Sequence, residues 1–446
     1  MNIAVVGTGY VGLVSGACLA DFGHTVTCID TDAGRIARLL RHDIPFFEPG
    51  LAEVVVRNAD AGRLRFTTEM ADGVRDSTVI FIAVGTPEGP GGEADVSQVM
   101  SAAVALAPHL RDYRVVATKS TVPIGTGAQL HATIQRHLRG SVSFDVVSNP
   151  EFLREGSAVN DFMRPDRVVI GVTGERAAET MREIYRPLYL IETPLVLTDV
   201  ETAEMIKYAS NAFLAVKISF INEVANLCDR VGADVHVVAK GMGLDKRIGP
   251  KFLHPGPGYG GSCFPKDTRA LAAIGRRHGV RQQLVESAIE INERQRGVIV
   301  EKLRDAIGEI AGREIAVLGL AFKPNTSDLR ESPAIDICLR LKAAGARIRA
   351  FDPVATPGAE AALGAGAHSI RFLGDVYDAV QGADAALIMT EWNELRNLDL
   401  ERIRPLMRRP VLIDTRNVLD PARTRAYGFV HVCTGRPMAG VGVGVA

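Results

Sequence analysis

Two parts of the chain alternate short apolar runs with helical segments. In the N-terminal part, apolar runs predict strands at 2–7, 78–85, 114–118 and 144–148 and a second strand that ends at residues 28–30, with a helix that ends at about residue 22. After residue 311 the alternation starts again, with strands predicted at 313–320, 347–351, 385–389 and 411–414 and a helix at 334–344. Strands that alternate with helices favour parallel sheets covered on both faces. The pattern therefore predicts an α/β fold of two Rossmann-like doubly wound domains.

Between these parts, residues 200–231 form one long helical pattern that ends near Gly232. Apolar residues occupy most of its circumference, so we expect the helix to be buried between domains or between subunits. It would be the long central helix that joins the two domains. We predict a cofactor-binding domain at 1–199, a central helical dimerisation domain at 200–300 and a C-terminal substrate-binding domain at 311–434. The Gly- and Ala-rich residues 435–446 are expected to form a mobile tail.

Composition narrows the possible partners and compartments. The formal net charge of −1 in 446 residues gives no electrostatic footprint for nucleic acid or an anionic membrane. The six cysteines show no paired metal-ligand spacing and are too sparse for a disulfide scaffold. We find no basic leader and no apolar stretch of membrane-spanning length. We therefore expect a cytoplasmic protein without a metal, a nucleic-acid partner or a membrane anchor.

The first strand leads directly into a glycine-rich turn, Gly7-Thr8-Gly9-Tyr10-Val11-Gly12, which opens the first helix. These glycines permit a tight turn and let a pyrophosphate approach the backbone at the helix N-terminus. Asp30, at the end of the second strand, is placed to bind the ribose hydroxyls of the nucleotide. A carboxylate there disfavours a 2′-phosphate, so NAD is expected rather than NADP.

Three further loops follow predicted strands, at 85–87, 119–123 and 149–151. In a doubly wound sheet, ligands bind beyond the carboxyl ends of the strands. We therefore expect these loops to surround the cofactor and the substrate.

The segment from Pro255 to Asp267 contains a glycine-rich loop followed by Cys263, Lys266 and Asp267. Pro265 fits the first position of a helix, so Cys263 should lie at a helix N-terminus, where the dipole favours a thiolate. A thiolate can attack a carbonyl carbon. The alternative is a small buried apolar side chain, but the glycines and charged neighbours favour a nucleophile.

Two other groups of polar residues are candidates for binding. Lys207 and Asn211 lie four positions apart on one face of the long apolar helix, where both need partners. The alternatives are a surface lysine and an asparagine that interrupts the helix. Lys323 and Arg330 lie in the loop after the first strand of the second domain. They suit a phosphate-bearing ligand, although a solvated basic loop would have the same composition.

Several of these motifs together resemble one family. They are the glycine turn, Glu48-Pro49-Gly50-Leu51, Lys119-Ser120-Thr121-Val122-Pro123, Asn149-Pro150-Glu151-Phe152-Leu153-Arg154-Glu155-Gly156, Lys207-Tyr208-x-x-Asn211, the Cys263 loop, Phe322-Lys323 and Asp328-x-Arg330-Glu331-Ser332. Over residues 1–434 the chain resembles the UDP-glucose/GDP-mannose dehydrogenases, enzymes that oxidise a sugar C6 alcohol to a carboxylate. The sequence around Cys263 is similar to that of the UDP-glucose branch. It differs from the Phe-Ala-Phe-Gly-Gly-Ser-Cys-Leu sequence of GDP-mannose enzymes and from the Gly-Gly-His-Cys type of N-acetylhexosamine enzymes.

The resemblance implies an NAD-dependent oxidation of UDP-glucose to UDP-glucuronate in two hydride transfers, through a thiohemiacetal and a thioester on Cys263. It implies that Lys207 and Asn211 stabilise the oxyanion, that Asp267 and Thr121 relay a proton through a water, and that Glu151 serves the hydrolytic water. The implied cofactor-binding residues are Gly7, Gly9, Tyr10, Val11, Gly12, Asp30, Arg35, Thr86, Thr121, Glu155, Cys263, Lys266 and Arg330. The implied substrate-binding residues are Glu151, Phe152, Leu153, Lys207, Asn211, Arg247, Phe252, Tyr259, Gly260, Phe322, Lys323 and Arg416. In relatives Arg247 reaches the sugar from a neighbouring subunit, which implies a homodimer or a larger assembly.

Other functions remain as alternatives. A GDP-mannose enzyme would share most motifs. A simple hydroxyacid dehydrogenase would reduce one NAD per substrate and would leave Cys263 and the second Rossmann-like domain without a role. A catalytically silent regulator would keep the fold, since fold alone does not determine function, but silent relatives usually lose a catalytic residue.

Overall fold

The computed structural model describes residues 1–436 and consists of two compact units, Met1–Ser210 and Asn211–Ala446. Of the tail predicted at 435–446, the first two residues are bonded within the second unit. Gly435 donates its N–H to Asp229 at 3.0 Å, and the guanidinium of Arg436 lies 3.2 Å from the carboxylate of Asp234. Residues 437–446 lie outside the described part of the chain.

The first unit contains an eight-stranded sheet in the order β3-β2-β1-β4-β5-β6-β7-β8. Its strands are β1 (Asn2–Val6), β2 (Thr25–Ile29), β3 (Leu64–Thr67), β4 (Val79–Ile82), β5 (Arg114–Thr118), β6 (Phe144–Ser148), β7 (Val168–Gly171) and β8 (Leu195–Thr198). Neighbouring strands pair in parallel except β6 and β7, which meet antiparallel at Ser148 and Gly171. The order reverses between β1 and β4, which places a ligand-binding edge beside the glycine turn.

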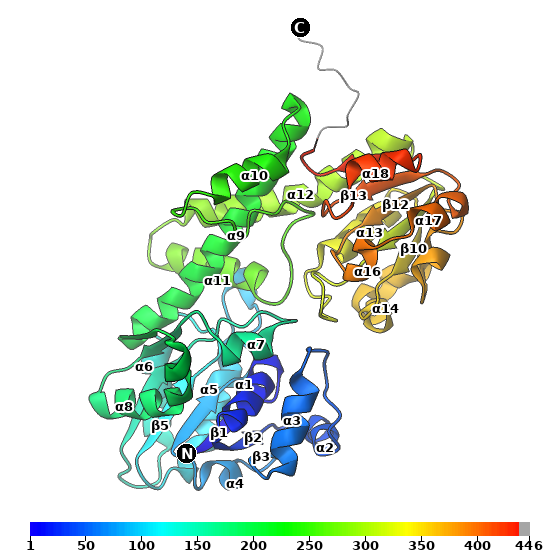
Figure 1. Cartoon of the computed structure of the whole chain (residues 1–446). Helices are drawn as coiled ribbons and strands as arrows, with labels where there is room; N and C mark the ends of the chain where they lie inside the picture. The colour runs from blue at the N-terminus through cyan, green and yellow to red at the C-terminus, as the bar shows by residue number, and fades with distance from the viewer. Residues whose placement is uncertain (437–446) are drawn as a thin grey trace. The chain divides into compact units, whose positions relative to one another are not determined.

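Helices cover both faces of this sheet (Figure 1). They are α1 (Tyr10–Asp21), α2 (Ala33–Leu39), α3 (Leu51–Asp60), α4 (Met70–Val74), α5 (Ser97–Leu106), α6 (Thr126–His137), α7 (Ala158–Met163) and α8 (Glu175–Ile184). One core contains residues of α1, α2, α3, α7 and α8, and a second contains residues of α4, α5 and α6. Strand β4 and residues 3–6 of β1 are apolar, and these strands contribute to both cores because alternate side chains point to opposite faces.

The second unit contains a six-stranded, all-parallel sheet in the order β11-β10-β9-β12-β13-β14. Its strands are β9 (Glu314–Leu318), β10 (Arg347–Phe351), β11 (Ile370–Phe372), β12 (Ala385–Ile388), β13 (Val411–Asp414) and β14 (Val430–Cys433). Its helices are α13 (Pro333–Ala343), α14 (Thr356–Leu363), α15 (Val376–Val380), α16 (Asn393–Arg396), α17 (Leu400–Leu406) and α18 (Pro421–Ala426). Residues of α13 and α14 pack on one face, and residues of α15, α16 and α17 pack on the other.

Long helices precede the second sheet. Helix α9 (Val200–Val231) is continuous and has the bounds that the sequence predicts; it is followed by α10 (Val235–Gly243), α11 (Phe264–Arg277) and α12 (Gln283–Ile307). The predicted fold class, two doubly wound domains joined by a long central helix, is confirmed. Within residues 1–436, no helix combines the length and the apolarity needed to cross a membrane.

Candidate active site

The glycine turn between β1 and α1 has the stereochemistry of a dinucleotide-binding loop. Gly7 has a φ of +100°, and a Cβ added to it would lie 2.7 Å from the carbonyl oxygen of Ala83. A Cβ on Gly12 would lie 1.9 Å from the carbonyl oxygen of Gly7. Beside Gly9, in contrast, a Cβ would meet nothing within 4 Å. Packing therefore requires the first and third glycines, while the second leaves open space at the start of α1, where no side chain caps the helix. This space suits a pyrophosphate.

Asp30, immediately after β2, has a carboxylate surrounded by donors. It accepts the N–H and the hydroxyl of Thr8, both at 2.8 Å, and the guanidinium of Arg35 at 2.9 Å. Partial burial opposes ionisation, but the hydrogen bonds from Asp32 and Thr8 and the charge of Arg35 outweigh it and lower the pKa of Asp30. The carboxylate is thus held ionised at the position where a ribose diol would bind.

Glu48 links the glycine turn to a distant loop. The hydroxyl of Tyr10 donates to its carboxylate, which also accepts the N–H groups of Gly156 and Ala158 at 2.6 and 2.8 Å. Glu48 is 7% exposed. The sequence marks Glu48 only as part of a motif and indicates no role for it. In the structure it ties the cofactor turn to the loop that contains Glu151 and Glu155.

The loops after β4 and β5 lie together, as expected for neighbouring parallel strands. The hydroxyl of Thr86 donates to the carbonyl of Thr121 at 2.9 Å, and that of Ser120 donates to the carbonyl of Val84 at 2.6 Å. These loops border the same edge of the sheet as the glycine turn.

Lys119, the first residue after β5, is buried. Its ammonium lies 5.7 to 5.9 Å from the ring centroids of Phe81, Phe162 and Tyr185, and 3.4 Å from the carbonyl oxygen of Asn149. Desolvation lowers the pKa of Lys119 to about 8, although the charge of Glu151 opposes the shift. The sequence gives Lys119 only as part of a motif; its burial depends on three rings far away in the chain.

Glu151 and Lys207 form a buried ion pair. The ammonium of Lys207 donates to the backbone carbonyl of Glu151 at 2.6 Å and to its carboxylate at 3.1 Å. The other carboxylate oxygen accepts the N–H of Leu153 at 2.5 Å. The ring of Phe152 lies 5.2 Å from the Lys207 ammonium and 3.5 Å from the Arg167 guanidinium. The structure therefore brings these predicted residues of the first unit together around one turn.

In the second unit, Cys263 is the N-cap residue of α11 and is only partly buried, with the hydroxyl of Ser262 3.5 Å from its sulfur. Asp267, one turn into α11, donates its N–H to the carbonyl of Cys263 at 2.8 Å. Its carboxylate is 1% exposed and accepts the amide of Asn211 and the ammonium of Lys266, both at 2.6 Å. A thiol at a helix N-terminus can serve as a nucleophile, and a buried carboxylate one helical turn away is a candidate base.

The loop before Cys263 packs against the loop after β9. The N–H of Gly261 donates to the carbonyl of Arg330 at 2.9 Å, and Gly261 has a φ of +84°. A Cβ on Gly261 would lie 2.7 Å from the ring of Phe322, and one on Gly260 would lie 2.3 Å from the carbonyl oxygen of Glu331. The glycines thus permit close contact between the cysteine loop and the loop after β9.

Aromatic rings and one arginine complete this region. The ring of Phe264 lies 6.0 Å from that of Phe252 and 6.2 Å from that of Tyr259. The guanidinium of Arg416, after β13, donates to the carbonyls of Met389 at 2.9 Å and Phe322 at 3.2 Å. It also lies 3.2 Å from the carboxylate of Glu391.

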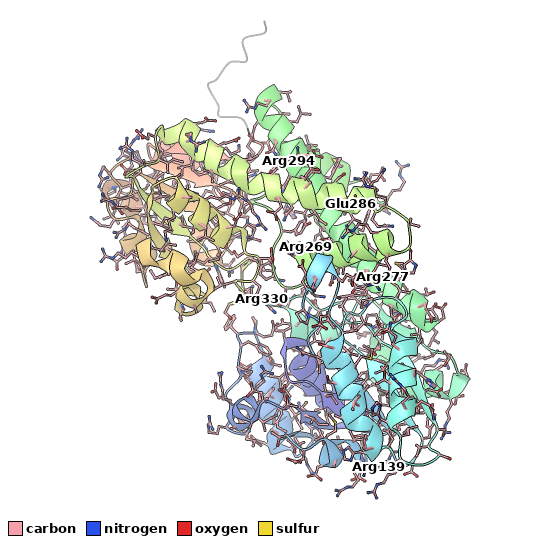
Figure 2. All side chains as sticks on the ribbon, turned by 180° about the vertical axis from the view of Figure 1, so that it is seen from behind. Arg139, Arg269, Arg277, Glu286, Arg294 and Arg330 are labelled. Carbon is pink, nitrogen blue, oxygen red and sulfur yellow. The ribbon has the colours of Figure 1, made fainter. Side chains whose placement is uncertain are left out.

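Of the remaining predicted basic residues, Lys323 is half-buried, whereas Arg330 and Arg247 are exposed. The ammonium of Lys323 lies over the ring of Phe322, 5.2 Å from its centroid. The side chain of Arg330, labelled in Figure 2, is 63% exposed and forms an ion pair with Asp328 at 2.8 Å. Arg247 lies in the turn after α10, 89% exposed and paired with Asp245 at 2.6 Å. An exposed guanidinium of this kind remains accessible to a ligand or a second chain.

Comparison with known proteins identifies the parts of the chain. Residues 1–189 match the NAD binding domain of the UDP-glucose/GDP-mannose dehydrogenase family, residues 201–294 match its central domain, and residues 316–421 match its UDP binding domain. The glycine turn lies within the first match, Cys263 within the second, and Lys323 with Arg416 within the third.

Two curated relatives and one solved structure are similar over nearly the whole chain. The UDP-glucose 6-dehydrogenase TuaD of Bacillus subtilis (strain 168) is 50% identical and covers 98% of this chain and 93% of its own. The UDP-glucose 6-dehydrogenase of Rhizobium meliloti (strain 1021) is 51% identical, covering 98% of this chain and 100% of its own. The UDP-glucose dehydrogenase of Pyrobaculum islandicum has a TM-score of 0.90 and 38% identity, with 97% of each chain covered.

Proposed function

Because this chain belongs to the UDP-glucose/GDP-mannose dehydrogenase family and is an NAD-dependent oxidoreductase, we propose that it oxidises the C6 alcohol of UDP-glucose to the carboxylate of UDP-glucuronate. The observation that carries the proposal is Cys263 at the N-terminus of α11, next to the buried Asp267. A simple alcohol oxidation has no need of a thiol, whereas oxidation to an acid can use one to hold the aldehyde.

The cofactor would bind to the first unit. The open space at Gly9, the uncapped start of α1 and the ionised Asp30 fit the pyrophosphate and the ribose diol of NAD. NAD, when bound, accepts two electrons and a hydrogen from the sugar carbon at each oxidation. Arg330 is proposed as a further cofactor contact, since its guanidinium is exposed.

The first oxidation removes a hydride and a proton from the alcohol. Asp267, with Thr121 and a water, would accept the proton, since its carboxylate lies one helical turn after Cys263 on α11. Lys207 and Asn211, one turn apart on α9, would donate to the oxygen on which negative charge develops.

The second oxidation depends on Cys263. Its sulfur adds to the aldehyde carbon, and the aldehyde oxygen takes up a proton, which gives a thiohemiacetal. Loss of a second hydride and of the hydroxyl proton converts it to a thioester. Water, activated by Glu151, then adds to the carbonyl, the C–S bond breaks, and the thiol and the carboxylate are released.

The nucleotide part of the substrate would bind the second unit. Phe322, Lys323 and Arg416 lie around the glycines of the cysteine loop, where rings and cations suit a base and a diphosphate. Tyr259, Gly260 and Phe252 would border the sugar. Discrimination between UDP-glucose and GDP-mannose would follow from the residues that contact the base.

We also propose a homodimer through α9. On this helix Phe213, Phe220 and Leu227 are 64%, 46% and 60% exposed. Their spacing of seven residues, close to two helical turns, places them on one face. An apolar stripe of this length is covered most simply by the same stripe of a second chain. The exposed Arg247 would then be available to the partner's substrate.

The stoichiometry of the reaction tests this function. Purified protein with UDP-glucose should reduce two NAD per uronate formed, and an added carbonyl-trapping amine should capture no aldehyde. GDP-mannose and UDP-N-acetyl sugars, supplied in parallel, should react at least ~100-fold less efficiently. One NADH per substrate would indicate a simple dehydrogenase, and preference for GDP-mannose would reassign the substrate.

Variants of Cys263 test the covalent mechanism. In Cys263→Ala the first oxidation can proceed slowly, but uronate production should collapse because no thiohemiacetal can form. In Cys263→Ser a covalent ester should accumulate and be visible by intact-protein mass spectrometry, because an alkoxide leaves less readily than a thiolate. Near-normal uronate production by Cys263→Ala would mean that the cysteine is a packing residue.

A further inference from the structure

The loop before Cys263 runs through the interior of the second unit without belonging to a helix or strand. Residues 255–260 are all buried. A buried loop has no ladder of backbone hydrogen bonds, so its N–H and C=O groups need other partners. Three side-chain amides supply them. They are Asn222 on α9 and Asn292 and Gln295 on α12, the long helix marked by Glu286 and Arg294 in Figure 2.

These amides bind both backbone groups of two loop residues. Gly256 donates its N–H to Asn222 at 2.8 Å and accepts the amide of Gln295 at 3.0 Å. Tyr259 donates its N–H to Asn292 at 2.7 Å and accepts the amide of the same side chain at 3.1 Å. Asn292 therefore pairs with Tyr259 much as a residue of a neighbouring β-strand would.

All three amides are buried, with exposures of 0% for Asn222, 3% for Asn292 and 1% for Gln295. The backbone lies so close to them that a Cβ on Gly258, whose φ is +112°, would be 2.7 Å from the side-chain oxygen of Asn292. The Nδ2 atom of Asn222 is buried without a hydrogen-bond partner among the described residues. An unsatisfied buried donor costs stability, so stability alone does not explain this choice of side chain.

We propose that Asn222, Asn292 and Gln295 are positioning residues, which hold the glycine-rich loop so that Cys263 captures the aldehyde before it escapes. The inference rests on the proposed function. A loop with this many glycines has little stiffness of its own, and a displacement of about 1 Å can slow a reaction about 100-fold. Asn292 binds the backbone four residues before the nucleophile. Loosening this loop slows thiol addition more than the first oxidation, which does not use the thiol.

Asn292→Ala tests the inference because it removes both bonds to Tyr259. Uronate formation should fall by about 10- to 100-fold, NADH per uronate should exceed two, and hydroxylamine should trap the missing product as an oxime. The KM for NAD should stay within about twofold. Gln295→Met keeps the length of the side chain and loses one bond to the loop, together with the bond that Gln295 accepts from Asn226 at 2.9 Å. It should raise the ratio of NADH to uronate by a smaller amount. It serves as the test if Asn292→Ala fails to fold.

Asn417 offers a matched control. Its side chain bonds both backbone groups of Thr434, at 2.8 and 2.9 Å, in the same reciprocal pattern, but these bonds join the segments that follow β13 and β14 and do not hold the cysteine loop. Because Asn417 has a φ of +53°, Asn417→Gly removes the amide without adding backbone strain. This variant should lose stability while it retains two NADH per uronate.

The outcomes separate cleanly. If Asn292→Ala yields two NADH per uronate and no trapped aldehyde, the positioning role is overturned and the proposed function is left intact. The same result in Gln295→Met has this meaning if only that variant folds. If Asn417→Gly releases aldehyde to the same extent, the release is a general effect of lower stability, and the positioning role is also overturned. A wild-type ratio of one overturns the proposed function and this inference together.

Discussion

Lys207 and Glu151 are bonded twice: the ammonium reaches both the backbone carbonyl of Glu151, at 2.6 Å, and its carboxylate, at 3.1 Å. Both side chains are buried. Lys207→Met should therefore leave a carboxylate buried without this partner and lower the free energy of unfolding by about 3–5 kcal/mol. Uronate production should fall at least ~100-fold. Urea unfolding and initial rates measure the two effects.

A double variant separates stability from catalysis at this pair. Combining Lys207→Met with Glu151→Gln removes both charges, so most of the stability should return while activity stays low. If activity returned together with stability, the pair would be structural and the oxyanion role of Lys207 would be wrong.

Asp30 should determine the choice of cofactor. A 2′-phosphate would be repelled by its carboxylate, so catalytic efficiency with NAD should exceed that with NADP by on the order of 100-fold, equivalent to roughly 2.7 kcal/mol. Asp30→Ser should narrow this preference, because it leaves the guanidinium of Arg35, now 2.9 Å from Asp30, to meet a phosphate. The double variant Asp30→Ser with Arg35→Ala should lose the improvement in catalytic efficiency with NADP that Asp30→Ser alone provides. Equal efficiencies in the wild type would contradict the assignment.

Lys323 and Arg330 should serve different ligands although they share one loop. Lys323→Ala is expected to raise mainly the KM for the sugar nucleotide, since Lys323 stacks on Phe322 beside the cysteine loop. Arg330→Ala is expected to raise mainly the KM for NAD. Steady-state kinetics with each substrate varied in turn would measure both effects, and identical changes in the two variants would mean that the loop is structural.

Lys119 should make stability depend on alkaline pH. Its pKa is about 8 in the folded chain, against an ordinary value of 10.5. Between these values the unfolded chain binds more protons, so stability rises with pH. Below pH 8 the buried charge costs up to about 3 kcal/mol. Lys119→Met should therefore be the more stable protein at pH 7, with an advantage that shrinks from pH 8 to 10.5.

Urea unfolding at several pH values measures the difference between wild type and Lys119→Met. Lys240→Met, which changes an exposed lysine on α10, is the control and should show no such trend. A difference that stays constant with pH would mean that Lys119 is not buried as a charged group.

The sequence by itself determined those features that depend on residues close together in the chain. Apolar runs predict most strands of both sheets, and the bounds of α9 match its apolar pattern. The turn at Gly7 and the capping position of Cys263 also follow from adjacent residues. The family can be recognised from short motifs for the same reason. These features are local because backbone geometry and helix capping act over a few residues.

Tertiary structure alone decided which side chains meet. Lys207 and Asn211 are predicted to share a face, but their partners Glu151 and Asp267 are each 56 positions away. The bond from Gly156 to Glu48 joins residues 108 apart, and no pattern near Glu48 indicates it. The sequence also does not indicate the amides that hold the cysteine loop, since it does not distinguish a buried asparagine from an exposed one. Burial and hydrogen bonding between distant segments exist only once the chain has packed, because only then does the loss of water require each polar group to find a partner.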